Sequence, residues 1–137
     1  MLSILHLAVS FAVQAQPAPP PPQPQPTAKS VPGVTRTVLL RSDLSGQTRE
    51  AIQVRVDFAP GAVFPRHMHS GEEMVYVLNG TLECRLEGQP RVTLTAGDVL
   101  LIPSGKIHAF ENVGLESASE LATYVVEKGK PLVTLVK

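Results

Sequence analysis

Residues 61–80 read GAVFPRHMHSGEEMVYVLNG and contain His67, His69 and Glu73. Side chains on a β-strand alternate between its two faces, so His67 and His69 point the same way if they share a strand. The Ser-Gly pair after His69 indicates a turn, which lets the chain fold back and bring Glu73 alongside the histidines. This stretch therefore predicts a cluster of three polar side chains at one end of a pair of strands.

Residues 73–78 continue as a β-rich run that ends in Asn79-Gly80, a pair typical of a β-hairpin. If Glu73 faces the interior, the alternation of the strand turns Val75 and Val77 inward as well. Apolar side chains are therefore expected to lie beside the cluster in the interior.

A second stretch, residues 97–112, reads GDVLLIPSGKIHAFEN and adds His108. A buried-strand run is followed by a Pro-Ser-Gly turn and then by a strand on which His108 and Phe110 share a face. Neutral imidazole nitrogens and a carboxylate oxygen suit Fe, Mn, Ni, Cu or Zn and need no thiolate. We expect His67, His69, Glu73 and His108 to meet around one such divalent ion.

The two stretches resemble the two motifs of the cupin family. The first resembles G-x5-H-x-H-x3-E-x6-G and the second resembles G-x5-P-x-G-x2-H-x3-N, with residues 81–96 between them. The ten matching positions are Gly61, His67, His69, Glu73, Gly80, Gly97, Pro103, Gly105, His108 and Asn112.

The resemblance implies an all-β fold, a single double-stranded β-helix or jelly-roll barrel. It also implies that His67, His69, Glu73 and His108 bind the metal, while the glycines, Pro103 and Asn112 are turn and strand-end positions. The alternative is a metal-free barrel whose histidines fill space, although burying an unpaired carboxylate is costly. Glu72 is the competing carboxylate and is expected to lie in solvent.

The rest of the chain supports a single all-β domain over residues 33–137. Residues 50–58 alternate cleanly, with Ile52, Val54, Val56 and Phe58 on one face, as in a half-buried antiparallel strand. Other short strand-like runs are separated by turn signals, with a polar break at residues 116–119 and a last strand at residues 132–136.

The first 28 residues carry no charged side chain and differ in kind from the rest. Residues 1–15 are mostly apolar and end in Val-Gln-Ala, as in a cleaved signal peptide, whereas an uncleaved anchor is the alternative. The apolar part is too short for a stable membrane span. Residues 16–32 are a proline-rich linker. We therefore predict export, to a periplasm or outside the cell.

Charge and cysteine content exclude other classes. The formal net charge is zero and no basic cluster is present, which argues against a nucleic-acid partner. Cys84 is the only cysteine, so no intrachain disulfide can form. It shares a face with Leu82 and Leu86 and is expected to be a small buried hydrophobe.

Three functions remain open. Four protein ligands leave up to two positions on an octahedral ion for a small molecule, which favours a metal-dependent enzyme. The resemblance makes dioxygenase-like, isomerase or decarboxylase chemistry plausible, with Glu73 as a possible proton carrier. The alternatives are a non-catalytic metal-binding or ligand-binding protein and a structural or sensory module.

The predicted strand faces describe the pocket and a possible partner. Arg55, Arg66 and Tyr76 are expected to point away from the interior. The pocket is then mainly apolar and suits a flat or aromatic ligand; its lining is Phe58, Phe64, Val75, Val77 and Phe110. Met74, Tyr76 and Leu78 form an outer stripe that either pairs with a second subunit, as in a homodimer, or packs on the chain's own second sheet.

Overall fold

The computed structural model describes residues 30–46 and 48–137. The predicted signal segment and most of the predicted linker lie outside these residues. The described residues form ten strands and no helix, and every strand pairing between them is antiparallel. The strands are β1 Val34–Asp43, β2 Arg49–Phe58, β3 Val63–Met68, β4 Gly71–Asn79, β5 Thr81–Leu86, β6 Val92–Thr95, β7 Val99–Ile102, β8 His108–Asn112, β9 Ala118–Glu127 and β10 Thr134–Leu135.

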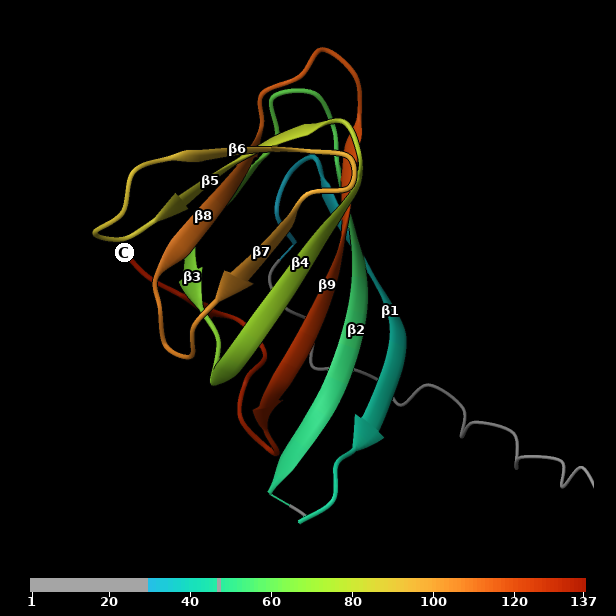
Figure 1. The fold of residues 1–137 in the computed structure, drawn as a ribbon, viewed down its shortest axis with the longest axis vertical. Coiled ribbons are helices and arrows are strands. Elements are labelled where there is room, and N and C mark those ends of the chain that lie inside the picture. The colour runs from blue at the N-terminus through green and yellow to red at the C-terminus, as the bar shows by residue number, and fades with distance from the viewer. Residues whose placement is uncertain (1–29, 47) are drawn as a thin grey trace, which may run out of the picture.

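The strands form two five-stranded sheets that pack face to face (Figure 1). One sheet has the order β1-β2-β9-β4-β7 and the other has the order β10-β3-β8-β5-β6. Strands that are distant in sequence, such as β2 and β9, therefore lie side by side. The predicted all-β class, a single double-stranded β-helix, is confirmed.

Strand alternation places the core between the sheets. On β2, Ile52, Val54, Val56 and Phe58 are at most 4% exposed, while the residues between them lie on the outer side. The same alternation continues on β9, whose even-numbered residues from Ala118 to Val126 are buried. Apolar side chains of both sheets form one cluster, as expected when period-two strands bury one face each.

The hairpin predicted at Asn79-Gly80 is wrong. β4 ends at Asn79 and β5 begins at Thr81, but the two strands belong to different sheets, so the chain crosses from one sheet to the other at Gly80. Gly80 has φ +79°, and a Cβ there would lie 2.6 Å from the Cα of Ala118. Asn79 donates a hydrogen bond to the Ser117 carbonyl at 2.9 Å. The pair is therefore used for a close approach to β9 rather than for a turn between paired strands.

Two boundaries also differ from the prediction. β9 begins at Ala118, inside the predicted polar break, because Ala118 and Ser119 pair with Phe58 and Asp57 of β2 and are 1% exposed. The strand predicted at residues 132–136 is reduced to the two residues of β10, Thr134–Leu135. Both differences come from pairing with remote strands, which a local pattern does not contain.

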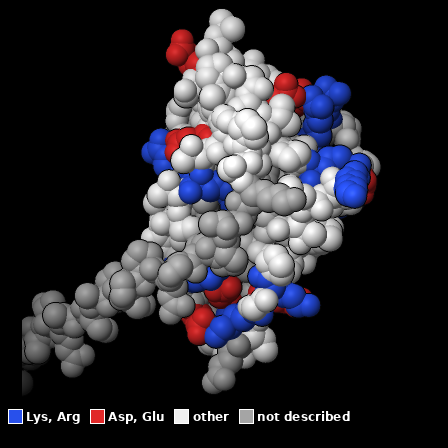
Figure 2. Space-filling view, turned by 180° about the vertical axis from the view of Figure 1, so that it is seen from behind, with Lys and Arg blue, Asp and Glu red and all other residues white. Residues whose placement is uncertain are grey.

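Charged side chains of both signs are interspersed on the surface. In Figure 2, lysines and arginines lie beside aspartates and glutamates rather than in a broad area of one sign. Ion pairs on the surface include Arg66–Glu87 at 2.7 Å and Arg85–Glu111 at 2.6 Å. In the part of the chain that the structure describes, no helix has the length and apolar character needed to cross a membrane.

An apolar stripe lies on the outer face of β4 and β7. Met74, Tyr76 and Leu78 are 41%, 46% and 37% exposed, so they do not pack on the chain's own second sheet. Val99 and Leu101 on the neighbouring β7 are 70% and 59% exposed. These five side chains are called the outer apolar stripe below.

Candidate metal centre

The four predicted ligands come from strands of both sheets. His67 lies on β3 and pairs in register with His108, the first residue of β8 in the same sheet. His69 follows β3 directly, and Glu73 lies on β4 in the other sheet. The turn after His69 thus does what its sequence predicts, because it brings a carboxylate from one sheet against imidazoles of the other.

The structure brings all four side chains together. Each residue offers one nitrogen or oxygen atom, and these atoms all lie within 4.8 Å of one another. His67, His69, Glu73 and His108 are between 1% and 3% exposed. The ring centroids of His67 and His108 are 4.1 Å apart, and those of His69 and His108 are 5.1 Å apart. We call these four residues the His/Glu cluster.

Backbone carbonyls orient the three imidazole rings. Nδ1 of His67 contacts the carbonyl oxygen of Pro65 at 2.7 Å, and Nδ1 of His108 contacts that of Lys106 at 2.9 Å. Nδ1 of His69 contacts the carbonyl oxygen of Leu132. A carbonyl only accepts hydrogen bonds, so each Nδ1 must be the protonated donor. The Nε2 atom of each ring is then left to face the cluster, as in metal-bound histidines.

The atoms at the centre of the cluster lack donors. Oε2 of Glu73 lies 3.0 Å from Nε2 of His69 and 3.1 Å from Nε2 of His108. None of these three buried atoms has a hydrogen-bond partner. Buried polar atoms without a partner are costly. A divalent cation would satisfy all three, so the residues fit such an ion.

The surroundings of His67 and Glu73 favour the protonation states in which these side chains bind metals. Burial, reinforced by His108 and His69, lowers the pKa of His67 to about 3 and keeps this ring neutral. Burial disfavours the Glu73 carboxylate, but contacts with His108 and His69 outweigh it and hold the pKa of Glu73 below its ordinary value. Neutral imidazoles and an ionised carboxylate are the forms that bind metals.

Sequence reasoning missed Tyr124. This residue lies on β9 directly opposite Glu73, and its ring centroid is 4.8 Å from that of His69. Its hydroxyl interacts with the Glu73 carboxylate. Burial, followed by the charge of Glu73, raises the pKa of Tyr124 well above its ordinary value, so the phenol stays protonated. The alternation of residues 120–126 is the signal that could have placed Tyr124 inside.

The prediction that the interior beside the cluster is mainly apolar needs correction. Phe58, Phe64, Val75, Val77 and Phe110 are buried at 7% exposure or less, as expected. However, Tyr124 and Glu120 on β9 also face the interior and are 3% exposed. The interior therefore holds polar groups outside the two motifs.

Other side chains lie on the strand faces that the alternation along each strand predicts. Arg55 is exposed and pairs with Asp57, Arg66 is exposed and pairs with Glu87, and Tyr76 belongs to the outer apolar stripe. Glu72 pairs with Arg49 at 2.8 Å on the surface, so it is not a member of the cluster.

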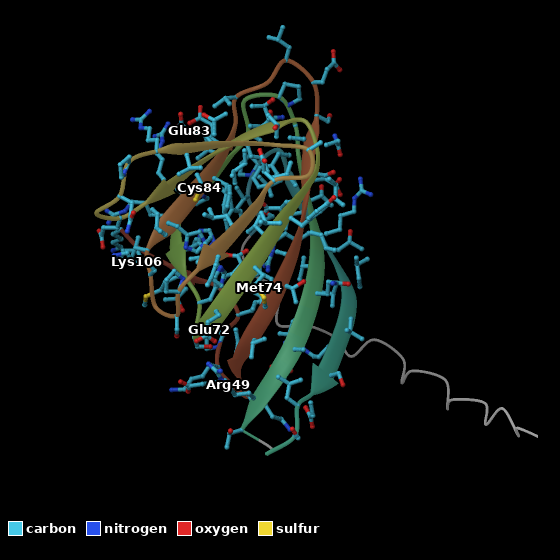
Figure 3. The ribbon with its side chains drawn as sticks, viewed as in Figure 1. Arg49, Glu72, Met74, Glu83, Cys84 and Lys106 are labelled. Carbon is cyan, nitrogen blue, oxygen red and sulfur yellow. The ribbon has the colours of Figure 1, made fainter. Side chains whose placement is uncertain are left out.

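Figure 3 shows Arg49 and Glu72 together near one end of the molecule, away from Cys84 on β5. Cys84 is a free, buried cysteine, as predicted. Burial is the largest of the effects that raise the pKa of its thiol to about 12, so the thiol stays protonated.

Known proteins are similar to this chain in sequence and in fold. The family pattern of the Cupin domain matches residues 54–125. Germin-like protein 5-1 of Oryza sativa subsp. japonica is 36% identical over 75 residues, which is 51% of this chain and 34% of that protein. Germin-like protein subfamily 1 member 5 of Arabidopsis thaliana is 31% identical over 100 residues, which is 66% of this chain and 45% of that protein. The chain therefore spans less than half the length of these curated relatives.

Solved structures agree with the sequence match. A recombinant oxalate oxidase in complex with glycolate superposes with a TM-score of 0.63 at 25% identity, covering 78% of this chain and 57% of that one. A double-stranded beta-helix protein of Klebsiella pneumoniae superposes with a TM-score of 0.65 at 20% identity, covering 80% and 90% of the two chains. The second likeness concerns the fold alone. With the family pattern matched over more than half of the sequence, the chain belongs to the cupin family.

Proposed function

We propose that the chain binds one divalent transition metal through His67, His69, Glu73 and His108 and uses it for chemistry on a small molecule. The observation that carries this proposal is the convergence of Nε2 of His69, Nε2 of His108 and Oε2 of Glu73, buried atoms without a hydrogen-bond partner. Such an arrangement is costly without a cation and stabilising with one. The donor set suits Fe, Mn, Ni, Cu or Zn.

The chain's own residues would hold and tune the site. Three backbone carbonyls fix the histidine rings, and the Tyr124 hydroxyl beside Glu73 restrains the carboxylate. A bound ion supplies a Lewis acid and positions for the oxygen atoms of a small molecule. The buried apolar residues around the cluster keep bulk water away, which strengthens electrostatic interactions inside.

We favour a metal-dependent oxidoreductase, dioxygenase-like in its use of oxygen. The oxalate oxidase that superposes on this chain at 25% identity has glycolate bound, which supports a small ligand with oxygen donors. Glu73 is the candidate proton carrier, since it is the carboxylate of the cluster. Isomerase and decarboxylase chemistry use the same donor set and are distinguished by the reaction measured.

A non-catalytic metal-binding or ligand-binding protein is the second candidate. The observation in its favour is the low exposure of the cluster, whose four residues are at most 3% exposed. A site this enclosed suits the retention of an ion as well as turnover.

Elemental analysis of protein purified without added metal tests the metal site. We expect about one divalent ion per chain in the wild type and in Glu72→Gln, the matched control on the surface. His69→Ala and Glu73→Gln should lose most of the metal while keeping the far-ultraviolet spectrum of the fold. Wild-type occupancy in both of these variants would reject the assignment.

Dioxygen uptake with diketones, flavonols and catechols tests the activity. Iron or manganese with uptake that Glu73→Gln abolishes supports the oxidoreductase. Stoichiometric zinc without turnover supports the binding protein instead.

We also propose that the protein is exported and forms a homodimer. The uncharged first 28 residues support a signal peptide at residues 1–15 and a linker at residues 16–32 before the barrel at residues 33–137. Amino-terminal sequencing of the exported protein tests the cleavage. The outer apolar stripe supports the dimer, since exposed apolar patches commonly mark protein interfaces.

A further inference from the structure

The His/Glu cluster lies near one end of the barrel. The strand β3 ends between His67 and His69. Glu73 is the third residue of β4, and His108 is the first residue of β8. Each of the four residues is at most 3% exposed. An ion that enters or leaves the cluster must therefore displace part of the protein at this end.

Residues 128–136 cross this end of the barrel from one sheet to the other. They follow β9 of the first sheet and reach β3 of the second sheet, where they form β10. Thr134 pairs there with Met68, and the amide of Val136 donates a hydrogen bond to the Arg66 carbonyl at 2.9 Å. Figure 1 shows this segment in dark red between β9 and β3. We call residues 128–136 the strap.

The strap contacts the cluster through the carbonyl of Leu132. Nδ1 of His69 donates a hydrogen bond to this carbonyl, which is 63 residues away in sequence. The rings of His67 and His108 instead contact carbonyls only two residues before them. The side chains of Leu132 and Val133 are partly buried and pack against the core. The orientation of one predicted ligand therefore depends on a segment that also covers the cluster.

The strap is attached to the second sheet by a short edge strand. β10 has two exposed residues and pairs with β3 alone. At the other end of the strap, Gly129 has φ +77°, and a Cβ there would meet nothing within 4 Å. Segments with few buried contacts and exposed backbone hydrogen bonds open at a low free energy. The strap therefore has a weak attachment at one end and a glycine with free space around it at the other.

Two other connections at this end are less suited to opening. His69 itself lies in the connection from β3 to β4, and residues 103–107 lead directly into His108. The amide of Gly105 also donates a hydrogen bond to the His69 carbonyl at 3.0 Å. Moving either connection would displace the backbone of a predicted ligand, whereas moving the strap leaves all four ligands on their strands and turn.

We propose that the strap is the gate of the metal site, which moves away from β3 to admit or release the ion and which a bound ion holds closed. Opening uncovers His69 and removes the Leu132 carbonyl that orients its ring. Such carbonyls fix the orientation of metal-binding histidines and strengthen metal binding. By linkage, an ion that binds more tightly when the strap is closed must stabilise the closed strap to the same extent. This inference rests on the proposed metal site and adds a route of entry and a coupled motion to it.

A disulfide between the strap and β3 tests the gate in the full-length, zinc-loaded protein. Met68→Cys with Thr134→Cys joins residues directly opposite each other, a separation that suits a disulfide. A chelator should extract zinc at least about tenfold more slowly from the oxidised form than from the reduced form, because the local opening is blocked. Thr37→Cys with Arg55→Cys is the matched control, since it joins opposite residues of β1 and β2 and should give equal rates in both forms.

Two measurements test the gate without an engineered bond. Hydrogen exchange of the Val136 amide in the wild type should be about fivefold slower, or more, with zinc than without it. The Gln89 amide, which is bonded in the turn after β5, should exchange equally in both states. Leu132→Ala should lose zinc to the chelator about fivefold faster than the wild type, since part of the packing that closes the strap is removed. Leu115→Ala, at a position that is 93% exposed, is its control and should keep the wild-type rate.

Equal extraction rates from the oxidised and reduced Met68→Cys/Thr134→Cys protein would overturn the gate. Val136 exchange that is the same with and without zinc would overturn it as well. If the double variant does not oxidise, Leu132→Ala decides, and a wild-type rate of zinc loss would reject the gate. A wild-type protein that retains no zinc would instead show that the proposed metal site is wrong, so the two failures are distinguishable.

Discussion

Tyr124 of β9 lies directly opposite Glu73 of β4, and its hydroxyl interacts with the Glu73 carboxylate. The centroid of its ring is 4.8 Å from that of His69. Groups that hydrogen-bond to metal ligands commonly contribute 10-fold to 100-fold to metal affinity. We expect Tyr124→Phe to weaken metal binding by about tenfold, because the ring stays and only the hydroxyl is lost. Competition with a coloured chelator measures the change. Tyr76→Phe, on the outer face, should bind as the wild type does, and equal affinities for all three proteins would contradict this role.

Glu120 should make stability depend on pH. Burial, followed by the charge of Glu73, raises its pKa in the folded state, so the folded protein holds a proton that the unfolded chain releases as the pH rises above the ordinary glutamate value. Wild-type stability should therefore fall as the pH rises from that ordinary value towards the raised one. Glu120→Gln should be more stable than the wild type at the upper end of this window, and the two should converge below it.

Urea unfolding at a series of pH values measures this difference. Glu116→Gln is the control, because Glu116 is exposed and should follow the wild-type curve at every pH. A constant offset between Glu120→Gln and the wild type would show that the buried charge is not the cause.

Alanine substitutions at Gly80 and Gly97 should distinguish the effect of backbone strain from the effect of close packing. Both have positive φ, +79° and +92°, but a Cβ at Gly80 would lie 2.6 Å from the Cα of Ala118, while one at Gly97 meets nothing within 4 Å. Alanine at either position should cost about 1–2 kcal/mol of unfolding free energy for the left-handed backbone. Gly80→Ala should cost about 1–3 kcal/mol more because β9 must move. Denaturant unfolding measures both, and equal losses would contradict the crossing described at Gly80.

The outer apolar stripe should be the contact between two copies of the chain. Leu101→Glu places a charge at a position that is 59% exposed in the single chain, so it should shift the protein from dimer to monomer. Sedimentation equilibrium measures the mass. Leu115→Glu is the control, since Leu115 is 93% exposed but lies outside the stripe. A wild type that stays monomeric at high concentration would reject the interface.

The motif residues could be located from sequence because their spacing is local. The two-residue spacing of His67 and His69 and the short turn before Glu73 fix their relative positions on adjoining strands. The inward faces of β2 and β4 followed from the same alternation, and the exposed positions of Arg55, Arg66 and Tyr76 agree with it. Pairing in register with His108 then completed the cluster.

Residues outside the motifs could not be located because their positions depend on remote pairing. Tyr124 and Glu120 face the interior only because β9 is inserted between β2 and β4. Arg36 joins them through the register of β1 with β2. The Asn79-Gly80 pair carries a hairpin signal, but whether its flanking strands pair with each other is decided by the order of strands in both sheets.

The His/Glu cluster takes His67 and His108 from one sheet and Glu73 from the other. In a chain whose single cysteine rules out an internal disulfide, an ion coordinated there would be a cross-link between the two sheets. Unfolding would then have to break coordination bonds before the sheets separate, so the lifetime of the native state, and its resistance to proteases, would follow the supply of metal.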